Sequence, residues 1–160
     1  MYFREKRCVQ KSIAKHLNTE LNSAFTDINV VLTWKDALQA SRPVVCVNLE
    51  STESSLREIG TTQLNNSHLI TIDIYAKSRG QAMDLADFIK DKVRDCFDYY
   101  LFSHSPLPGN YDALEETKSG KVRTVKFLRD EPIDFGDTSD ERDRFRHTIA
   151  IQVKVTPNAC

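Results

Sequence analysis

A change of hydrophobic period within residues 67–100 constrains the fold of this chain more than any other feature. Before the change, Ile70, Ile72 and Ile74 alternate with polar or mixed residues, which is typical of a strand that buries one face. After it, apolar residues recur at steps of three and four, and charged residues fill the positions between them, as in an amphipathic helix. The segment therefore predicts a strand that leads directly into a helix.

The start of this helix is predicted at Ser78, because Ser78 and Gln81 have the spacing of a capping box. The apolar residues expected on its buried face are Ala82, Leu85, Ala86, Ile89, Val93 and Phe97. A strand and a helix of this kind form a scaffold, and nothing in the segment carries a catalytic signature.

Other segments predict one more helix and further strands. Apolar residues recur at steps of four near the N-terminus without an interrupting proline or glycine, which predicts a helix of about five turns. Strands are predicted at residues 30–32, as a short extended or strand-like piece, and at residues 44–49, 69–75, 122–129 and 148–155. The second of these should pair with the third, and the fourth should place Val125 and Phe127 on one face.

These elements indicate the α+β class in a single domain spanning residues 1–160. We expect an antiparallel or mixed sheet of about four to five strands, with two main helices packed on one face.

The connections between the predicted elements are long and polar. Residues 50–66, 103–120 and 130–145 are expected to form projecting loops or arms, since each is too long for a tight turn. Two interpretations of residues 50–66 stay open: a mobile surface loop, or a hairpin arm that orders only against a neighbouring copy. Residues 35–42 are expected to be a polar linker. Trp34, the single tryptophan, is expected to pack in the core, with an interface anchor as the alternative.

The charge of the chain is balanced overall but divided locally. The net charge of −1 removes the usual argument for a dedicated nucleic-acid binder, which carries a basic excess. Acidic residues gather in 130–143, and basic residues gather near the N-terminus at Arg4, Lys6, Arg7, Lys11 and Lys15. Each group is either an ordinary solvated surface or one side of a contact with a partner. Basic residues at a helix start oppose the helix dipole, which favours an acidic partner there.

The cysteines and the apolar segments give no sign of a metal site or a membrane span. Cys8, Cys46, Cys96 and Cys160 are scattered, without the close pairs that zinc sites use, so reduced structural cysteines are expected. No apolar stretch near the N-terminus resembles a signal sequence, and no run of about 20 apolar residues is present to span a bilayer. We therefore expect synthesis in the cytosol and no membrane partner.

No group of residues has the pattern of a catalytic, cofactor-binding or metal-binding site. The histidines lie far apart, the glycines never cluster into a phosphate-binding loop, and the acidic run 134–141 lacks the spacing of a calcium loop. Glu50 and Asp73, on adjacent predicted strands, imitate a nuclease carboxylate pair, but no lysine stands in a matching arrangement. They are interpreted as polar positions on a half-exposed sheet face. We expect no enzymatic activity, no cofactor and no bound metal.

Several segments together carry a resemblance to a known family. They are the opening amphipathic helix, the strand Arg42-Pro43-Val44-Val45-Cys46-Val47, the polar excursion to Gly60, the strand Leu69-Ile70-Thr71-Ile72-Asp73-Ile74-Tyr75-Ala76, the helix start Gly80-Gln81-Ala82 and the final strand from Ile149 to Val155. In this order of elements the chain resembles the tail terminator, or tail-completion, proteins of tailed bacteriophages. The resemblance covers most of the chain and lies in the fold pattern.

The resemblance implies a structural virion protein of the phage tail and neck, synthesised and assembled in the host cytoplasm. Its subunits are expected to form a homo-oligomer, usually a hexameric ring, at the head-proximal end of the tail. Such a ring ends tube growth and joins the tail to the head. The implied partners are the tail tube protein and the head–tail connector or stopper protein, with duplex DNA passing through the lumen without specific binding.

A ring needs one surface patch to meet a different patch on the next copy, so opposed basic and acidic surfaces are useful in it. The candidate residues for this subunit interface are Arg4, Lys6, Arg7, Lys11, Arg57, Glu58, Asp137, Asp140 and Glu141.

Two alternatives stay open. The chain could be another neck ring, either a head-completion or a stopper protein. From a different class, a ferredoxin-like module could bind nucleic acid on its sheet and stack bases on Tyr75 or Phe127, although the chain lacks an aromatic and basic RNA-binding signature.

Overall fold

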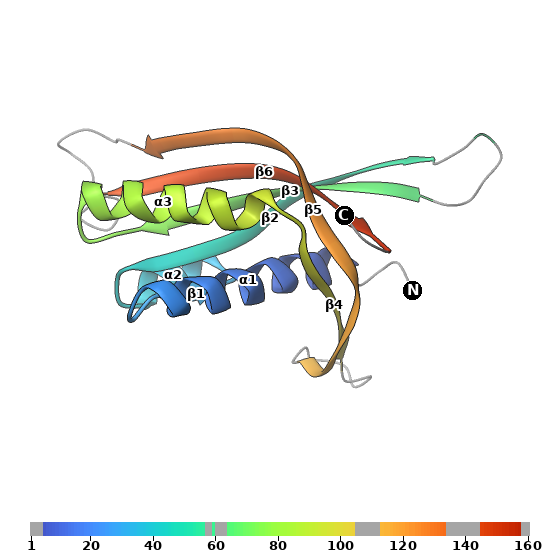
Figure 1. Cartoon of the computed structure of the whole chain (residues 1–160), viewed down its shortest axis with the longest axis horizontal. Coiled ribbons are helices and arrows are strands. Elements are labelled where there is room, and N and C mark those ends of the chain that lie inside the picture. Colours follow the sequence, from blue (N-terminus) through green and yellow to red (C-terminus); the bar gives the residue numbers. More distant parts are fainter. Residues whose placement is uncertain (1–4, 57–58, 60–63, 105–112, 134–144, 158–160) are drawn as a thin grey trace.

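The computed structural model describes residues 5–56, 59, 64–104, 113–133 and 145–157, which build one mixed sheet and three helices (Figure 1). The elements in chain order are α1 (Glu5–Ala24), β1 (Asn29–Val31), α2 (Trp34–Gln39), β2 (Val44–Leu56), β3 (Leu64–Tyr75), α3 (Arg79–Arg94), β4 (Phe97–His104), β5 (Ala113–Ile133) and β6 (Arg146–Thr156). The described strands lie in the order β1-β2-β3-β6-β5-β4, with β1 parallel to β2 and the other neighbours antiparallel.

The α+β class and the mixed sheet are confirmed, but the expected strand number is wrong. The described part of the chain has six strands instead of four to five, because β4 was not predicted. Phe97 and Tyr99 are buried on one face of β4, so its aromatic residues fit a half-buried strand. The strand also docks on α1, where the Ser12 hydroxyl accepts a hydrogen bond from the Tyr100 backbone N–H at 3.0 Å.

The main core lies between the sheet and the two long helices. α1 and α3 lie on the same face, and the edge of Phe25 meets the ring of Phe88 at 5.1 Å between centroids, which joins the end of α1 to α3. The central hairpin pairs as predicted, with Val47 opposite Ile72. The strand residues buried against these helices are Val45, Val47, Ile70, Ile72, Ile74, Ile149, Ile151 and Val153.

The start of α3 follows the predicted capping box. The Ser78 hydroxyl accepts from the Gln81 backbone N–H at 3.2 Å, and the Gln81 side chain accepts from the Lys77 backbone N–H at 2.8 Å. The helix ends at Arg94, so Phe97 belongs to β4, although it is buried as expected.

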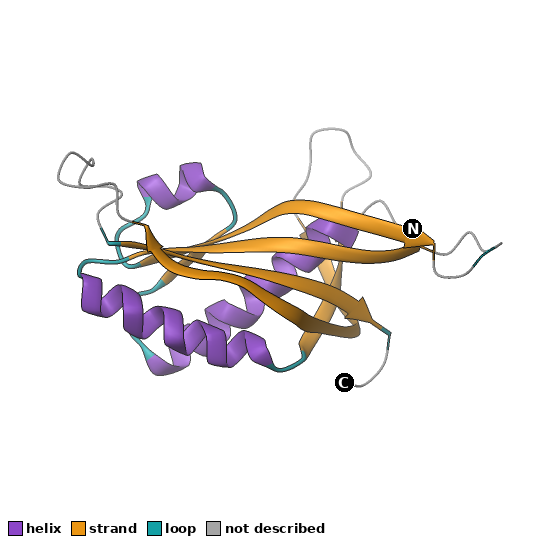
Figure 2. Cartoon of the chain, turned by 90° about the horizontal axis from the view of Figure 1, so that it is seen from above, coloured by secondary structure: helices purple, strands orange, loops and turns teal. Residues whose placement is uncertain are grey.

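The predicted linker at residues 35–42 is partly a helix, and the prediction that Trp34 packs in the core is wrong, whereas its alternative role as an interface anchor stays a prediction. Thr33 caps α2 by accepting from the Asp36 backbone N–H at 3.1 Å, and Trp34, the first helical residue, is 58% exposed. Figure 2 shows α2 across the sheet from α1 and α3, where Ala37 packs on Val44, Cys46 and Tyr75. α2 is a short helix, and Ala37 is its buried residue. The indole of Trp34 therefore lies outside the core.

The cysteines fulfil the expectation in part. Cys8 and Cys46 are free, buried thiols, and burial raises the pKa of Cys46 to about 11. Cys96 is disulfide-bonded, which contradicts the prediction that every cysteine is reduced. Cys160 lies outside the described residues. None of the described helices is long and apolar enough to cross a membrane.

Candidate interaction surface

Strands β2 and β3 run past their neighbours and continue together as a two-stranded ribbon. β1 pairs with β2 only over residues 44–46, and β6 pairs with β3 only from His68 onward. Residues 53–56 therefore pair only with residues 64–67 in the described sheet, and we call these two segments the arm. Figure 1 shows the arm projecting from the body of the sheet on the right. The described part of residues 50–66 forms a hairpin within one chain, and the ordering of this hairpin against a neighbouring copy stays a prediction.

The arm exposes most of its side chains. Ser54 donates to the Asn66 side chain at 2.7 Å across the ribbon, and Leu56, at the end of β2, is 63% exposed. A two-stranded ribbon is marginally stable alone in water, because it buries little apolar surface. The arm therefore depends on its base or on a partner for order.

A buried histidine fixes the base of the arm to α1. His68 is fully buried, with Nε2 at 2.8 Å from Glu5 Oε1 and Nδ1 at 2.9 Å from Thr52 Oγ1. Asn66 donates to the other carboxylate oxygen of Glu5 at 3.1 Å. The hydrogen bond from His68 lowers the pKa of Glu5, with a further contribution from Asn66, and these outweigh the opposing effect of burial. The charged carboxylate is thus the form that holds the first turn of α1 to β3 at the base of the arm, and His68 in turn contacts Thr52 on β2.

A second exposed surface lies on the part of β5 that β4 does not cover. β4 pairs with β5 only as far as Val122, and no described strand pairs with the outer edge of β5 beyond that residue. Register shifts in the pairing with β6 leave Val125 and Leu128 unpaired, and these two side chains are 51% and 48% exposed. We call the following exposed residues the β5 strip: Arg123, Val125, Lys126, Phe127, Leu128 and Arg129.

These bulges overturn the simple alternation predicted for residues 122–129. Val122 is buried in the core as a strand residue should be, but the extra residue at Val125 breaks the two-residue period. Phe127, opposite Ile151, is 36% exposed. The strip combines three apolar side chains and three cationic ones, with no acidic residue between Arg123 and Arg129.

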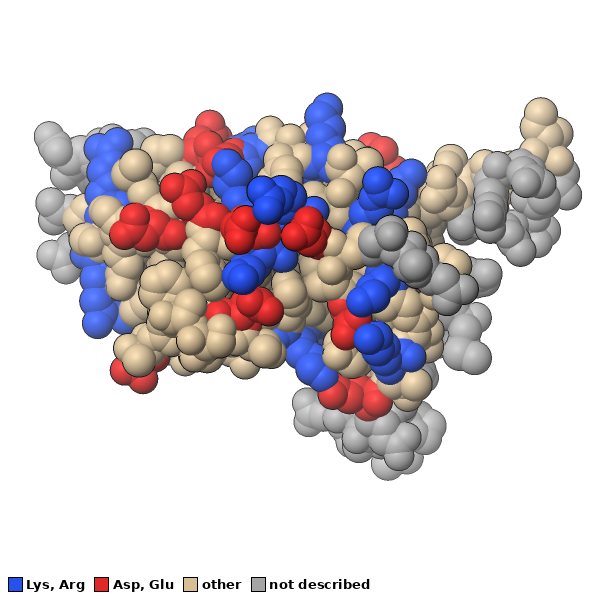
Figure 3. All heavy atoms as spheres, in the orientation of Figure 1, with Lys and Arg blue, Asp and Glu red and all other residues tan. Residues whose placement is uncertain are grey.

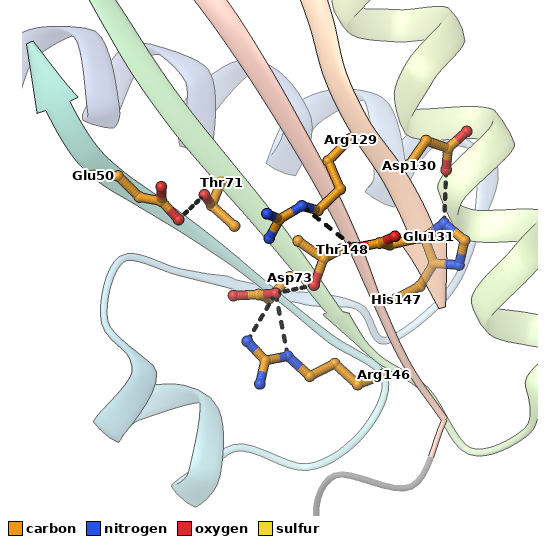
Figure 4. Close-up of polar contacts among 9 residues, drawn as sticks. All are labelled: Glu50, Thr71, Asp73, Arg129, Asp130, Glu131, Arg146, His147 and Thr148. Atoms are coloured by element: carbon orange, nitrogen blue, oxygen red, sulfur yellow. Dashed lines mark hydrogen bonds and ion pairs between the residues drawn. The ribbon is translucent and has the colours of Figure 1, made fainter. Parts of the chain in front are cut away.

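Polar contacts cross the sheet face opposite α1 and α3 (Figure 4). Asp73 Oδ1 accepts from the buried Thr148 hydroxyl at 2.6 Å and from Arg146 Nε and Nη2 at 3.2 and 3.1 Å. Two residues before Asp73 on β3, Thr71 donates to Glu50 on the neighbouring strand β2. Asp73 is therefore paired within the chain, as a polar residue of the sheet, but it is buried at 8% exposure, so the prediction of a half-exposed position is wrong for this residue.

Asp130, the first residue of the acidic segment 130–143, also makes contacts within its own chain. Asp130 lies 2.6 Å from Lys90 Nζ on α3 and 2.7 Å from Nε2 of the buried His147. Burial raises the pKa of Asp130, but the hydrogen bonds from Lys90 and His147 outweigh it and the pKa lies below its ordinary value. This cluster ties α3 to the end of the sheet. Figure 3 shows acidic and basic side chains interspersed over the visible face.

The structure describes only part of the predicted subunit interface. Lys6 is exposed in the first turn of α1, whereas Arg7 and Lys11 are half-buried, and Lys11 Nζ lies 5.4 Å from the centre of the Phe102 ring. The predicted residues that lie outside the described ranges are Arg4, Arg57, Glu58, Asp137, Asp140 and Glu141. The contact between the basic start of one copy and the acidic segment of the next stays a prediction.

Lys15, next along the basic face of α1, is engaged in its own chain. It pairs with Glu116 on β5, and its ammonium lies 4.0 Å from the centre of the Tyr100 ring. This part of the basic N-terminal group therefore helps to hold α1 against β4 and β5.

Two shallow clefts lie away from the arm and the strip. One, of about 450 Å³, is bordered by Asp27, Lys77 and Asp84, and the other, of about 330 Å³, by Lys15, His16 and Asp98. Within the described ranges, no three His, Cys, Asp or Glu side chains are grouped to hold a metal ion. Tyr75, one of the two aromatics considered for base stacking, is 2% exposed and so not accessible to a base.

The sequence matches no protein-family model and no curated protein.

Sequence reasoning missed the β5 strip, because a bulge has no reliable signal in a single sequence. The run Val125-Lys126-Phe127-Leu128 does contain two adjacent apolar residues inside an alternating strand. That interruption of the period is the one feature that could have indicated a bulge.

Proposed function

We propose that this chain is a structural subunit of a ring at the head-proximal end of a phage tail, of the tail terminator kind. In this role it ends growth of the tail tube and joins the tail to the head connector, and DNA passes through the ring. The observation that carries the proposal is the arm, a two-stranded extension of the central strands that has no other strand beside it in the described residues.

The arm supports the proposal because it suits head-to-tail assembly. In a closed ring, each copy presents one patch to a different patch on its neighbour. A projection that reaches away from the body can supply one of these two patches. The exposed Leu56 and the marginal stability of a lone ribbon both favour burial against another chain.

Charge is compatible with the passage of DNA. A basic lumen would bind phosphates and slow transit, and the chain has a net charge of −1. Another neck ring, a head-completion or stopper protein, would use the same properties, so the proposal extends to the neck rings as a class.

The proposal is tested by the mass and shape of the purified protein. We expect sedimentation analysis over a wide concentration range to detect a closed oligomer, and electron microscopy to show a ring with an opening of duplex width. A monomer at every concentration, or a monomer that binds single-stranded nucleic acid, would contradict the ring and favour the binding module.

A shortened variant tests the part played by the arm. Replacing residues 54–66 with Asn-Gly keeps Thr52 and His68 and closes the hairpin with a two-residue turn between Glu53 and Ser67. We expect a folded monomer that fails to assemble. Normal rings from this variant would count against an assembly role for the arm.

A further inference from the structure

We propose that, in the assembled protein, the arm of one copy lies along the β5 strip of the next copy. This inference rests on the proposed ring and names the two surfaces that meet within it. The strip is then the receiving patch, and Glu53 and Leu56 belong to the arm. Glu50 lies three residues before Glu53 on β2, where it accepts from Thr71.

The first support is complementary charge. The exposed part of β2 carries Glu50 and Glu53, and the described residues 47–56 contain no lysine or arginine. The β5 strip carries Arg123, Lys126 and Arg129 without an acidic residue among them, and of these Arg129 also pairs with Glu131 of its own chain at 3.3 Å. Opposite charges on two separate patches favour contact between different copies in one orientation.

The second support is apolar surface on both sides. Leu56 is 63% exposed near the end of the arm, and the isolated described residue Ile59 is fully exposed. On the strip, Val125 and Leu128 are unpaired at their bulges and are exposed beside Phe127. Contact between these groups removes apolar surface from water on both copies.

The geometry places the two patches on different copies. Within one chain, β6 lies between β3 and β5, so the arm cannot lie beside the strip as a neighbouring strand. Figure 1 shows the arm leaving the sheet at one end, whereas β5 runs from there toward the other end. A head-to-tail contact brings the arm of one copy to the strip of the next.

Side chains should dominate this contact. The two bulges on β5 interrupt the regular ladder that an added strand needs, and charged residues on an edge have the same protective effect. The bulges therefore make the strip selective for a partner with matching side chains.

Cross-linking provides the direct test. A carbodiimide joins a carboxylate to a lysine without a spacer, so we expect a Glu53–Lys126 link in the assembled protein. Mixing unlabelled and ¹⁵N-labelled chains before assembly should give hybrid linked peptides, which identify the link as intermolecular. A link found only within single chains would overturn the proposal.

Charge reversal provides the second test. Glu53→Lys and Lys126→Glu should each weaken assembly at least about tenfold, and the double variant should regain most of the loss. Asp95→Lys, just after α3, and Lys35→Glu, in α2, are at exposed positions outside the arm and the strip; they are the matched controls and should assemble normally. Far-UV circular dichroism checks that every variant is folded.

The outcomes separate this inference from the proposed function. Rings that form normally in both single variants, without the hybrid link, overturn the arm–strip contact and leave the ring intact. An open or smaller oligomer that gives the hybrid link supports the contact and contradicts the closed ring. A wild-type monomer at every concentration overturns both.

Discussion

At the scale of single residues, two buried polar side chains, His68 and Thr148, are paired with carboxylates on elements that are distant in sequence. Glu5 and His68 lie 63 positions apart, and Asp73 and Thr148 lie 75 apart. A buried polar group costs free energy unless it is hydrogen-bonded, so each pair fixes the relative position of its two elements. These residues are expected to matter for stability and for the direction of the arm.

Replacing Glu5 with Gln should make stability less dependent on acid. The folded-state pKa of Glu5 is lowered, so its carboxylate stabilises the fold above the unfolded pKa, and this contribution is lost as the pH falls through the folded pKa. At neutral pH we expect Glu5→Gln to cost about 1 kcal/mol. The difference from wild type should shrink below about pH 4.3, the ordinary pKa of Glu. Urea denaturation at several pH values measures it, and a difference that persists unchanged at low pH would contradict this role.

Replacing Asp73 with Ala should destabilise the sheet by about 2 kcal/mol. The change removes the acceptor of the buried Thr148 hydroxyl and the carboxylate beside Arg146. Asp91→Ala is the control, because Asp91 makes an exposed ion pair with Arg94 and its loss should cost less than about 1 kcal/mol. Equal effects of the two substitutions on the urea midpoint would refute the structural role of Asp73.

At the scale of elements, the long strand β5 decides the shape of the sheet. It pairs with β4 over residues 113–122 and with β6 over residues 121–133, so one strand serves two neighbours in succession. The change of neighbour occurs beside Gly120, whose φ of +151° is rarely adopted by other residues. A Cβ there would lie 2.5 Å from the Thr156 carbonyl oxygen.

Two glycine substitutions should change the free energy of unfolding in opposite directions. Gly120→Ala should lower the free energy of unfolding by about 1 to 3 kcal/mol, because the backbone is strained and the methyl group meets the main chain of β6. Gly80→Ala, in the first turn of α3 with open space around it, should raise it by up to about 1 kcal/mol. Thermal unfolding of both variants is the measurement. A stabilising Gly120→Ala would show that β5 does not need this conformation.

Helices and strands could be predicted from the sequence where the pattern of apolar and capping residues lies within one short segment. The helices α1 and α3 and the pairing of β2 with β3 follow from apolar periods and a capping pair. The strand β4 and the helix α2 did not, since one is short and aromatic and the other buries a single alanine.

At the scale of the whole molecule, the described chain joins a well-packed body to an arm that buries little. The core of the body is made by α1, α3 and the central strands, whereas residues 53–56 and 64–67 pair only with each other. Segments with few buried contacts open at lower free energy than the core. The protein therefore contains two regions of different local stability.

Hydrogen exchange should detect this difference. In the monomer, we expect backbone amides of the arm to exchange much faster than those of residues 70–74, and assembly should slow exchange in the arm and in the β5 strip together. Mass spectrometry of peptic peptides measures both regions in one experiment. Protection of the arm without protection of the strip would place the partner of the arm elsewhere.

The sequence by itself determined the fold class, the two long helices, the central hairpin and the polar character of the face that carries Asp73. Each of these follows from the spacing of apolar and polar residues within a short segment of the chain. Only the tertiary structure decided the number of strands, the direction of the arm and the exposure of the β5 strip. These depend on where neighbouring strands stop and on bulges that shift the register of β5, and both are set by contacts between distant residues.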